Sequence, residues 1–131
     1  MSDSTALKNI KSALNKKDFV LSLMNSHIAD TSVNHTFEVP SDVTAGSIYI
    51  TIDSTYNGTT GTIALNGSND GTNFALLLSD DESQNMQFTL AASDHDIFQI
   101  KRRLFKYYRL VYTKGDATLG NISATFVGIK E

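Results

Sequence analysis

The chain has 131 residues, a length that suits one domain with a single hydrophobic core. Its 40% hydrophobic and 19% charged residues exclude a wholly disordered protein. It has no cysteine, which excludes disulfides and thiolate metal ligands. No apolar run approaches the ~18 residues of a membrane span, and residues 1–5 lack the features of a signal peptide. We therefore expect synthesis in the cytosol without Sec export, and no membrane partner.

The formal net charge of −3 is unevenly distributed along the chain. Residues 1–17 carry four lysines and one acid, and residues 101–114 carry six cations and no acid. The remainder of the chain must therefore carry a net charge of −12. Such asymmetry is typical of an oriented surface that meets a partner.

The N-terminal residues have the apolar spacing of a helix. Leu7, Ile10 and Leu14 fall at i, i+3 and i+7, and Ser4 can cap the first turn, which predicts a helix over residues 4–16. A weaker continuation to residue 28 leaves open one long helix of the coiled-coil type that associates with its copies. We favour a short helix followed by a strand from Phe19 to Leu23. This choice divides the chain into a helical arm, residues 1–17, and a β-domain, residues 18–131.

The β-domain begins with two alternating segments. Residues 33–39 alternate as far as Pro40, the single proline. In residues 47–53, three isoleucines share one face, while Tyr49 and polar residues share the other. One face should be core, and the other should meet solvent or a partner.

The clearest signal is a hairpin over residues 62–78. Two alternating runs flank a cluster of turn-forming residues that ends in Asp70-Gly71, a pair that tolerates positive φ. This pattern predicts that Ile63 and Leu65 pair with Phe74, Leu76 and Leu78.

Shorter signals follow the same rules as far as the end of the chain. The expected strands are residues 86–90, 98–100, 104–113 and 118–129, and the expected turns or loops are residues 57–61, 80–83, 94–96 and 114–116. In residues 104–113, Lys106, Tyr108, Leu110 and Tyr112 should share one face. About eight or nine strands with closely spaced turns predict an all-β fold, an antiparallel, jelly-roll-like β-sandwich with a short N-terminal helix.

The residues that could carry chemistry do not form a recognisable constellation. His27, His35 and His95 are the only histidines, and they fall in separate segments, so we predict no metal site. The segment from Asn66 to Gly71 resembles the start of a calcium loop, but Leu77 stands where a bidentate glutamate is required. Nucleophile and phosphate-loop motifs are absent. We therefore expect no enzymatic activity and no cofactor.

The segment from Lys101 to Arg109 combines cations with aromatic residues. That composition is typical of platforms for single-stranded nucleic acid. Neither face of the expected strand is a clean basic stripe, however, and the net charge is acidic. We favour a core strand whose charges meet acidic residues of the chain or of a neighbour, and we do not expect a nucleic-acid partner.

Two stretches resemble small β-sandwich virion proteins of tailed bacteriophages. Gly67-Ser68-Asn69-Asp70-Gly71-Thr72-Asn73-Phe74 is similar to a hairpin signature of these proteins, although they often have Trp where Phe74 stands. Tyr107-Tyr108-Arg109-Leu110-Val111-Tyr112-Thr113, with Gly120 and Ala124 after it, is similar to a second signature. The resemblance implies a non-enzymatic, commonly oligomeric subunit for capsid decoration, a head fibre or the tail.

The resemblance and the charge distribution together give our leading expectation. The protein would be a structural virion component, assembled in the bacterial cytoplasm, with itself and other virion proteins as partners and a trimer as one candidate oligomer. The expected contact residues are Leu7, Ile10, Leu14, Lys101, Arg102, Arg103, Lys106 and Arg109. The alternative is a carbohydrate- or receptor-binding module that would bind a host-surface glycan through Tyr49, Tyr56 and residues 57–60.

Overall fold

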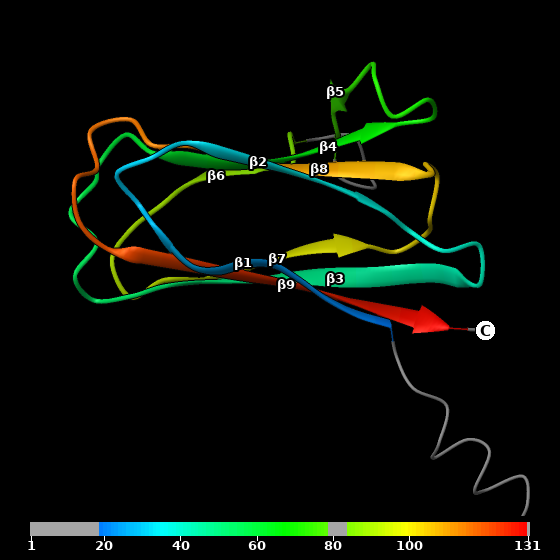
Figure 1. Cartoon of the computed structure of the whole chain (residues 1–131), viewed down its shortest axis with the longest axis horizontal. Helices are drawn as coiled ribbons and strands as arrows, with labels where there is room; N and C mark the ends of the chain where they lie inside the picture. The colour runs from blue at the N-terminus through cyan, green and yellow to red at the C-terminus, as the bar shows by residue number, and fades with distance from the viewer. Residues whose placement is uncertain (1–18, 79–83, 131) are drawn as a thin grey trace, which may run out of the picture.

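The computed structural model describes residues 19–78 and 84–130, which form two antiparallel sheets packed face to face (Figure 1). The strands are β1 (Phe19–Ile28), β2 (Val33–Glu38), β3 (Val43–Ile52), β4 (Thr62–Ser68), β5 (Ala75–Leu76), β6 (Gln87–Thr89), β7 (His95–Ile100), β8 (Tyr107–Thr113) and β9 (Asn121–Lys130). The predicted all-β sandwich is confirmed. The predicted helix over residues 4–16 lies outside the described residues.

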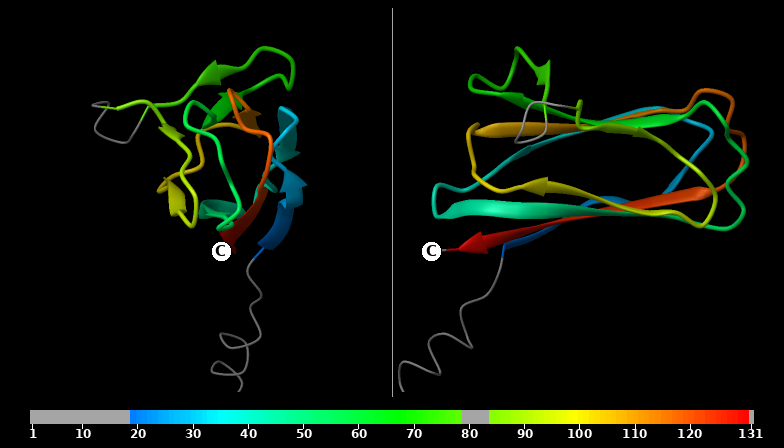
Figure 2. Two further views of the ribbon diagram at one scale, coloured as in Figure 1. Left: turned by 90° about the vertical axis from the view of Figure 1, so that its left-hand side faces the viewer. Right: turned by 180° about the vertical axis from the view of Figure 1, so that it is seen from behind.

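The strand order is that of a jelly roll. Sheet A has the order β1-β9-β3-β7, and sheet B has the order β2-β8-β4-β5, with β6 also paired to β4. Strands β5 and β6 pair with opposite ends of β4 and share one position in sheet B. The chain therefore passes between the sheets at nearly every connection, as in the two Greek keys of a jelly roll. Figure 2 shows β1 and β2 along one side of the sandwich and β6 and β7 along the other.

Strand β1 excludes the single long helix. Residues from Phe19 to Ile28 pair with β9, with register shifts between Ser22 and Met24 and between Met24 and His27. A bulge inserts an extra residue and changes the phase of the alternation. Leu23 and Met24 are consequently both buried. The bulges therefore explain why an extended segment imitates helical spacing.

The core lies between the two sheets and follows the predicted alternation. Ile48, Ile50 and Ile52 of β3 are all at most 3% exposed. Tyr108, Leu110 and Tyr112 of β8 are buried opposite them and share one face of the strand, as predicted. Lys106, expected on the same face, is exposed and precedes β8.

The predicted pairing of the hairpin is wrong by one residue. Asn66 pairs with Leu76 and Gly67 with Ala75, so Leu76 points outward, and Leu77 packs against the core. The connection, residues 69–74, is longer than a two-residue Asp-Gly turn, and a one-residue shift exchanges the faces of a strand. Ile63 pairs instead with Phe88 of β6.

Three other boundaries differ from expectation. The turn expected at residues 94–96 lies at residues 92–93, and His95 and Asp96 begin β7. Strand β8 begins at Tyr107, because residues 103 and 106 bond to Thr44 and Val39 outside a ladder. Strand β9 begins at Asn121. The acidic loop expected at residues 80–83 lies outside the described residues. Leu78 and Asn85, on either side of it, form an isolated antiparallel bridge.

We predict that Gly46→Ala destabilises the protein. A Cβ atom at Gly46 would lie 2.6 Å from Cε1 of Phe126 and 2.8 Å from the Val127 carbonyl oxygen, inside the packed sheet. Overpacking of this kind costs about 1–3 kcal/mol in the free energy of unfolding. Urea denaturation measures the loss. Thr51→Ala, on the outer side of the same strand, is the control and should change stability little. Equal stability of Gly46→Ala and the wild type would contradict the packing.

Candidate functional site

The predicted basic residues lie at one end of the sandwich, on the right in Figure 1. This end carries the start of β1, the end of β9 and the β7–β8 loop, residues 101–106. Lys101 and Arg102 are exposed there, and they line a crevice between the side with β7 and the β5 region. Lys106 lies on the opposite side, where its Nζ is 3.6 Å from Oε1 of Glu38.

The remaining two cations are held by the fold. Arg103 is half-buried, and its backbone N–H donates to the Thr44 carbonyl oxygen at 2.6 Å. Arg109 is half-buried under the ring of Phe74, whose centroid is 4.3 Å from the guanidinium carbon. The basic segment therefore crosses the end of the sandwich and does not form one stripe. Leu7, Ile10 and Leu14 lie outside the described residues.

The loops at the two ends of the sandwich differ in charge. At the end opposite the basic segment, the connections β1–β2, β3–β4, β6–β7 and β8–β9 contain Asp30, Asp53, Asp94 and Asp116, with Lys114 as the single cation. At the basic end, the connections β2–β3, β4–β5 and β7–β8 contain four cations, residues 101–103 and 106, and two acids, Asp42 and Asp70. The described loops therefore give the molecule a basic end and an acidic end.

The two stretches that carry the family resemblance pack against each other. Ser68 pairs with Tyr107 and Gly67 with Tyr108 across the β4–β8 ladder. The β4–β5 loop then folds over the outer surface of sheet B (Figure 2). There the ring of Phe74 covers the guanidinium group of Arg109. We call this unit, residues 67–74 with residues 107–113, the signature lock.

Asp70 fixes the loop of the signature lock. Its carboxylate accepts hydrogen bonds from the backbone N–H of Asn73 and Thr72, and from Nδ2 of Asn73. These bonds hold the pKa of Asp70 well below its ordinary range. Gly71 follows with φ of +76°, a conformation that glycine adopts without strain. The Asp-Gly pair thus closes a folded loop instead of a two-residue turn.

We predict measurable coupling between Phe74 and Arg109. Each of Phe74→Ala and Arg109→Ala should lower the free energy of unfolding, and the double variant should lose less than the sum. A cation–π contact of this type contributes about 0.5–2 kcal/mol, which a double-mutant cycle in urea measures. Thr72→Ala, in the same loop, is the control and should keep the backbone bond to Asp70. Strict additivity of the two losses would contradict the lock.

The acidic end is held together by hydrogen bonds between loops. Asp116 accepts hydrogen bonds from the backbone N–H and hydroxyl groups of Thr59 and Thr60, and Asn57 bonds to Thr118 and Leu119. The bonds from Thr59 and Thr60 keep the pKa of Asp116 well below its ordinary range.

The residues proposed for glycan binding are divided by this arrangement. Tyr56 is 4% exposed and belongs to the core, so its ring cannot stack on a sugar, and Tyr49 lies in sheet A. Asn57, Thr59 and Thr60 already bond to the β8–β9 loop. The structure does not bring the three glycan candidates together on one surface.

The histidines are partly brought together. His27 donates from Nε2 to the Thr31 carbonyl oxygen at 2.6 Å and lies edge-on to Tyr112, while His95 is exposed on β7. His35 lies on β2, and burial, followed by the charge of nearby His27, lowers its pKa below the ordinary 6.5. Within the described residues, no group of three or more His, Asp or Glu side chains could hold a metal ion.

We predict a pH dependence of stability that His35 carries. Because the pKa of His35 is lower in the folded state, the unfolded chain binds more protons below pH 6.5. Stability should therefore be highest above pH 6.5 and fall as the pH drops toward 5. Urea denaturation at several pH values should show a weaker dependence in His35→Gln. The His95→Gln control should keep the wild-type slope. Identical slopes for His35→Gln and the wild type would contradict this assignment.

The outer surface of sheet A is a candidate site that the sequence argument only partly anticipated. We call it the sheet A face. It consists of Val20, Ser22, Ala45, Ser47, Tyr49, Thr51, His95, Ile97, Gln99, Ser123, Thr125, Val127 and Ile129. None of these is Asp, Glu, Lys or Arg. For residues 47–53 the alternation predicts a face that meets solvent or a partner, and the lack of charge at the outward positions of the four strands is a further signal in the sequence.

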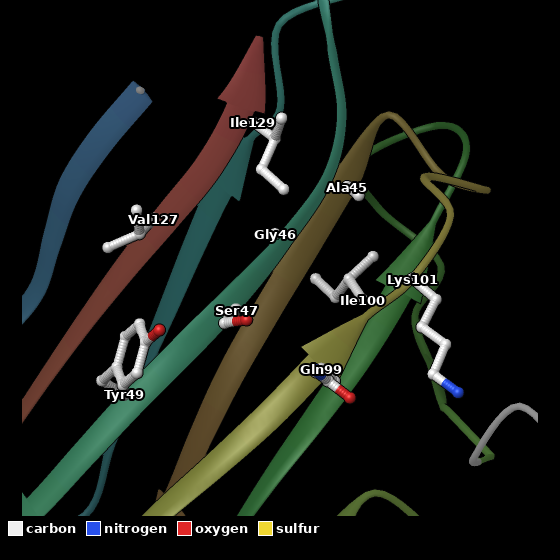
Figure 3. Close-up of a pocket in the computed structure, with 9 residues that line it drawn as sticks. All are labelled: Ala45, Gly46, Ser47, Tyr49, Gln99, Ile100, Lys101, Val127 and Ile129. Atoms are coloured by element: carbon white, nitrogen blue, oxygen red, sulfur yellow. The ribbon is translucent and has the colours of Figure 1, made fainter. Parts of the chain in front are cut away.

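A shallow, open hollow of about 420 Å³ lies on the sheet A face (Figure 3). Its floor includes the small consecutive residues Ala45, Gly46 and Ser47. Tyr49 and Ile129 flank it on one side, and Gln99 and Lys101 lie on the other. The hollow is open to solvent and lacks convergent charged groups, so it suits contact with another surface.

Comparisons with known proteins leave the family open. Neither a family model nor a curated protein matches the sequence. Among the described residues, no helix is long and apolar enough to cross a membrane.

Proposed function

We propose that the chain is a non-enzymatic structural protein of a tailed-phage virion, a capsid-decoration, head-fibre or tail-associated subunit. It acts by contacts with copies of itself and with other virion proteins. The observation that carries the proposal is the signature lock, because both stretches of the resemblance contribute to one packed unit. The jelly-roll order is compatible with it, since viral capsid domains are among the users of that architecture.

The charge distribution supports attachment through the basic end. Residues 101–103 lie at the same end of the sandwich as the start of β1, although β1 and β7 are opposite edges of sheet A. Residues 1–17 add a further net charge of +3. An acidic surface on the particle would complement this end, while the acidic end with its bonded loops would face outward.

The lowered pKa values of three aspartates support a structural role for the loops. Asp53, Asp70 and Asp116 all have a lowered pKa. The main cause is a hydrogen bond from another loop residue for Asp70 and Asp116, and from the Asn121 backbone at the start of β9 for Asp53. These groups fasten the loops in place. Carbohydrate binding is the alternative hypothesis. Of its two aromatic candidates, Tyr49 is exposed and Tyr56 is buried, so we do not favour it.

We predict that the protein is present in purified particles. Phage particles produced from the genome that encodes the chain should contain it at a copy number comparable to other structural subunits. Quantitative mass spectrometry of banded particles measures this. Its absence from particles whose other structural proteins are detected would refute the proposal.

The same particles test the attachment end. Arg102→Glu, at the basic end, should reduce the copy number per particle, because it reverses a charge that faces the acidic surface we propose. Lys114→Glu is the matched control, since it reverses one exposed cation at the opposite end. Equal incorporation of the two variants would count against attachment through the basic end.

A further inference from the structure

We infer that the sheet A face is the surface through which two copies of this chain associate face to face. The inference rests on the proposed function, because it names the self-contact that such a subunit would use. The observations that carry it are the apolar side chains, the absence of charge and the shape of this face.

Every strand of sheet A exposes at least one large apolar side chain on its outer side, and β1 adds a second, Ile28, at its far end with 58% exposure. One from each strand lies on the sheet A face. These are Val20 at 63%, Tyr49 at 48%, Ile97 at 57% and Ile129 at 54% exposure. Half-buried Val127 and Ala45 lie between them in the register. A contiguous exposed apolar patch with a polar surround marks an interaction site more often than a free surface.

The absence of charge selects a second copy as the partner. In a two-fold contact the same patch meets itself, so a patch without charge leaves no buried ion without a partner. The sheet A face has no Asp, Glu, Lys or Arg, and Lys101 lies only at the margin of its hollow (Figure 3). A nucleic acid or a strongly charged protein would instead require a complementary charged surface.

The size of the face suits a small specific contact. Strands are ~4.8 Å apart and rise ~3.3 Å per residue, so the thirteen outward positions present a flat area of roughly 400 Å², which side-chain relief enlarges. Standard interfaces bury about 800 Å² per partner and weaker ones less than about 600 Å², so this face suits a contact at the small end of the range. Two such faces can pack ~10 Å apart, as the two sheets of a sandwich do.

The face is also suited in shape to a contact with itself. The ring of Tyr49 projects beside the hollow above Ala45, Gly46 and Ser47. In a two-fold arrangement each copy places its Tyr49 in the hollow of the other. A projecting aromatic ring that enters a pocket is the usual form of an energetic hot spot.

Sedimentation velocity on the full chain tests the inference. The wild type should sediment with twice the mass of one chain at micromolar concentration. Ile97→Glu should weaken association at least tenfold, since each copy would place a carboxylate in the contact. Leu119→Glu is the matched control: Leu119 is 59% exposed, against 57% for Ile97, but it lies in the β8–β9 loop, and association should not change.

A second variant, Gln99→Glu, distinguishes lost association from lost folding. It replaces an exposed polar residue of the same face by a charged residue of the same shape, so it should leave the fold intact. It should also weaken association, with an unchanged melting temperature. A wild type that is monomeric or trimeric would overturn the inference. So would association that Ile10→Glu abolishes while Ile97→Glu and Gln99→Glu leave it intact, since the arm would then carry the contact.

The result is separable from the particle experiment. A monomer that is present in particles would overturn the face-to-face contact and leave the virion role standing. A dimer that depends on the sheet A face but is absent from particles would refute the virion role and leave the contact standing.

Discussion

The pairing of β3 with β9 is the constraint on which the rest of the structure depends. Nine residues of β3 pair with β9, although the two strands are far apart in sequence. This register places Ile48 and Ile50 beside Phe126 and Ala124, and all four side chains are buried. Because side chains alternate strictly, the same register turns Tyr49 and Val127 outward. The core and the sheet A face are therefore two consequences of one pairing.

Aspartate side chains determine the shape of the loops. Asp70 holds the loop over Arg109, Asp116 joins two loops of the acidic end, and Asp53 bonds to Thr55 and Asn121. Each carboxylate serves several donors, so each loop has a defined position relative to the sheets. The chain's preference for Asp over Glu has this physical basis, since the short side chain reaches nearby backbone N–H groups.

Alternation made the strand faces predictable, and it failed where the backbone is irregular. The buried positions of residues 48–52 and 108–112 follow directly from period two. The faces of the bulged strand β1 and of the residues after the six-residue loop 69–74 did not follow period two. The bulges of β1 depend on the distant strand β9, and the loop is longer than a two-residue turn because Asp70 bonds to Thr72 and Asn73. The position of Phe74 over Arg109 could not be predicted from the local sequence pattern either, because it depends on the register between β4 and β8. Alternation predicted the outward face of residues 47–53, but the neighbouring apolar residues of β1, β7 and β9 could not be placed beside it without the strand order of sheet A.

The antiparallel pairing of β1 with β9 has a mechanical consequence. Phe19 pairs with Gly128, so the first and last described strands meet at the same end of the sandwich. Tension applied between Phe19 and Gly128 would break the hydrogen bonds between β1 and β9 one after another, instead of loading all of them at the same time. A domain with this geometry resists little force along its own backbone. Any load it transmits is better carried laterally, across the broad surfaces of its sheets.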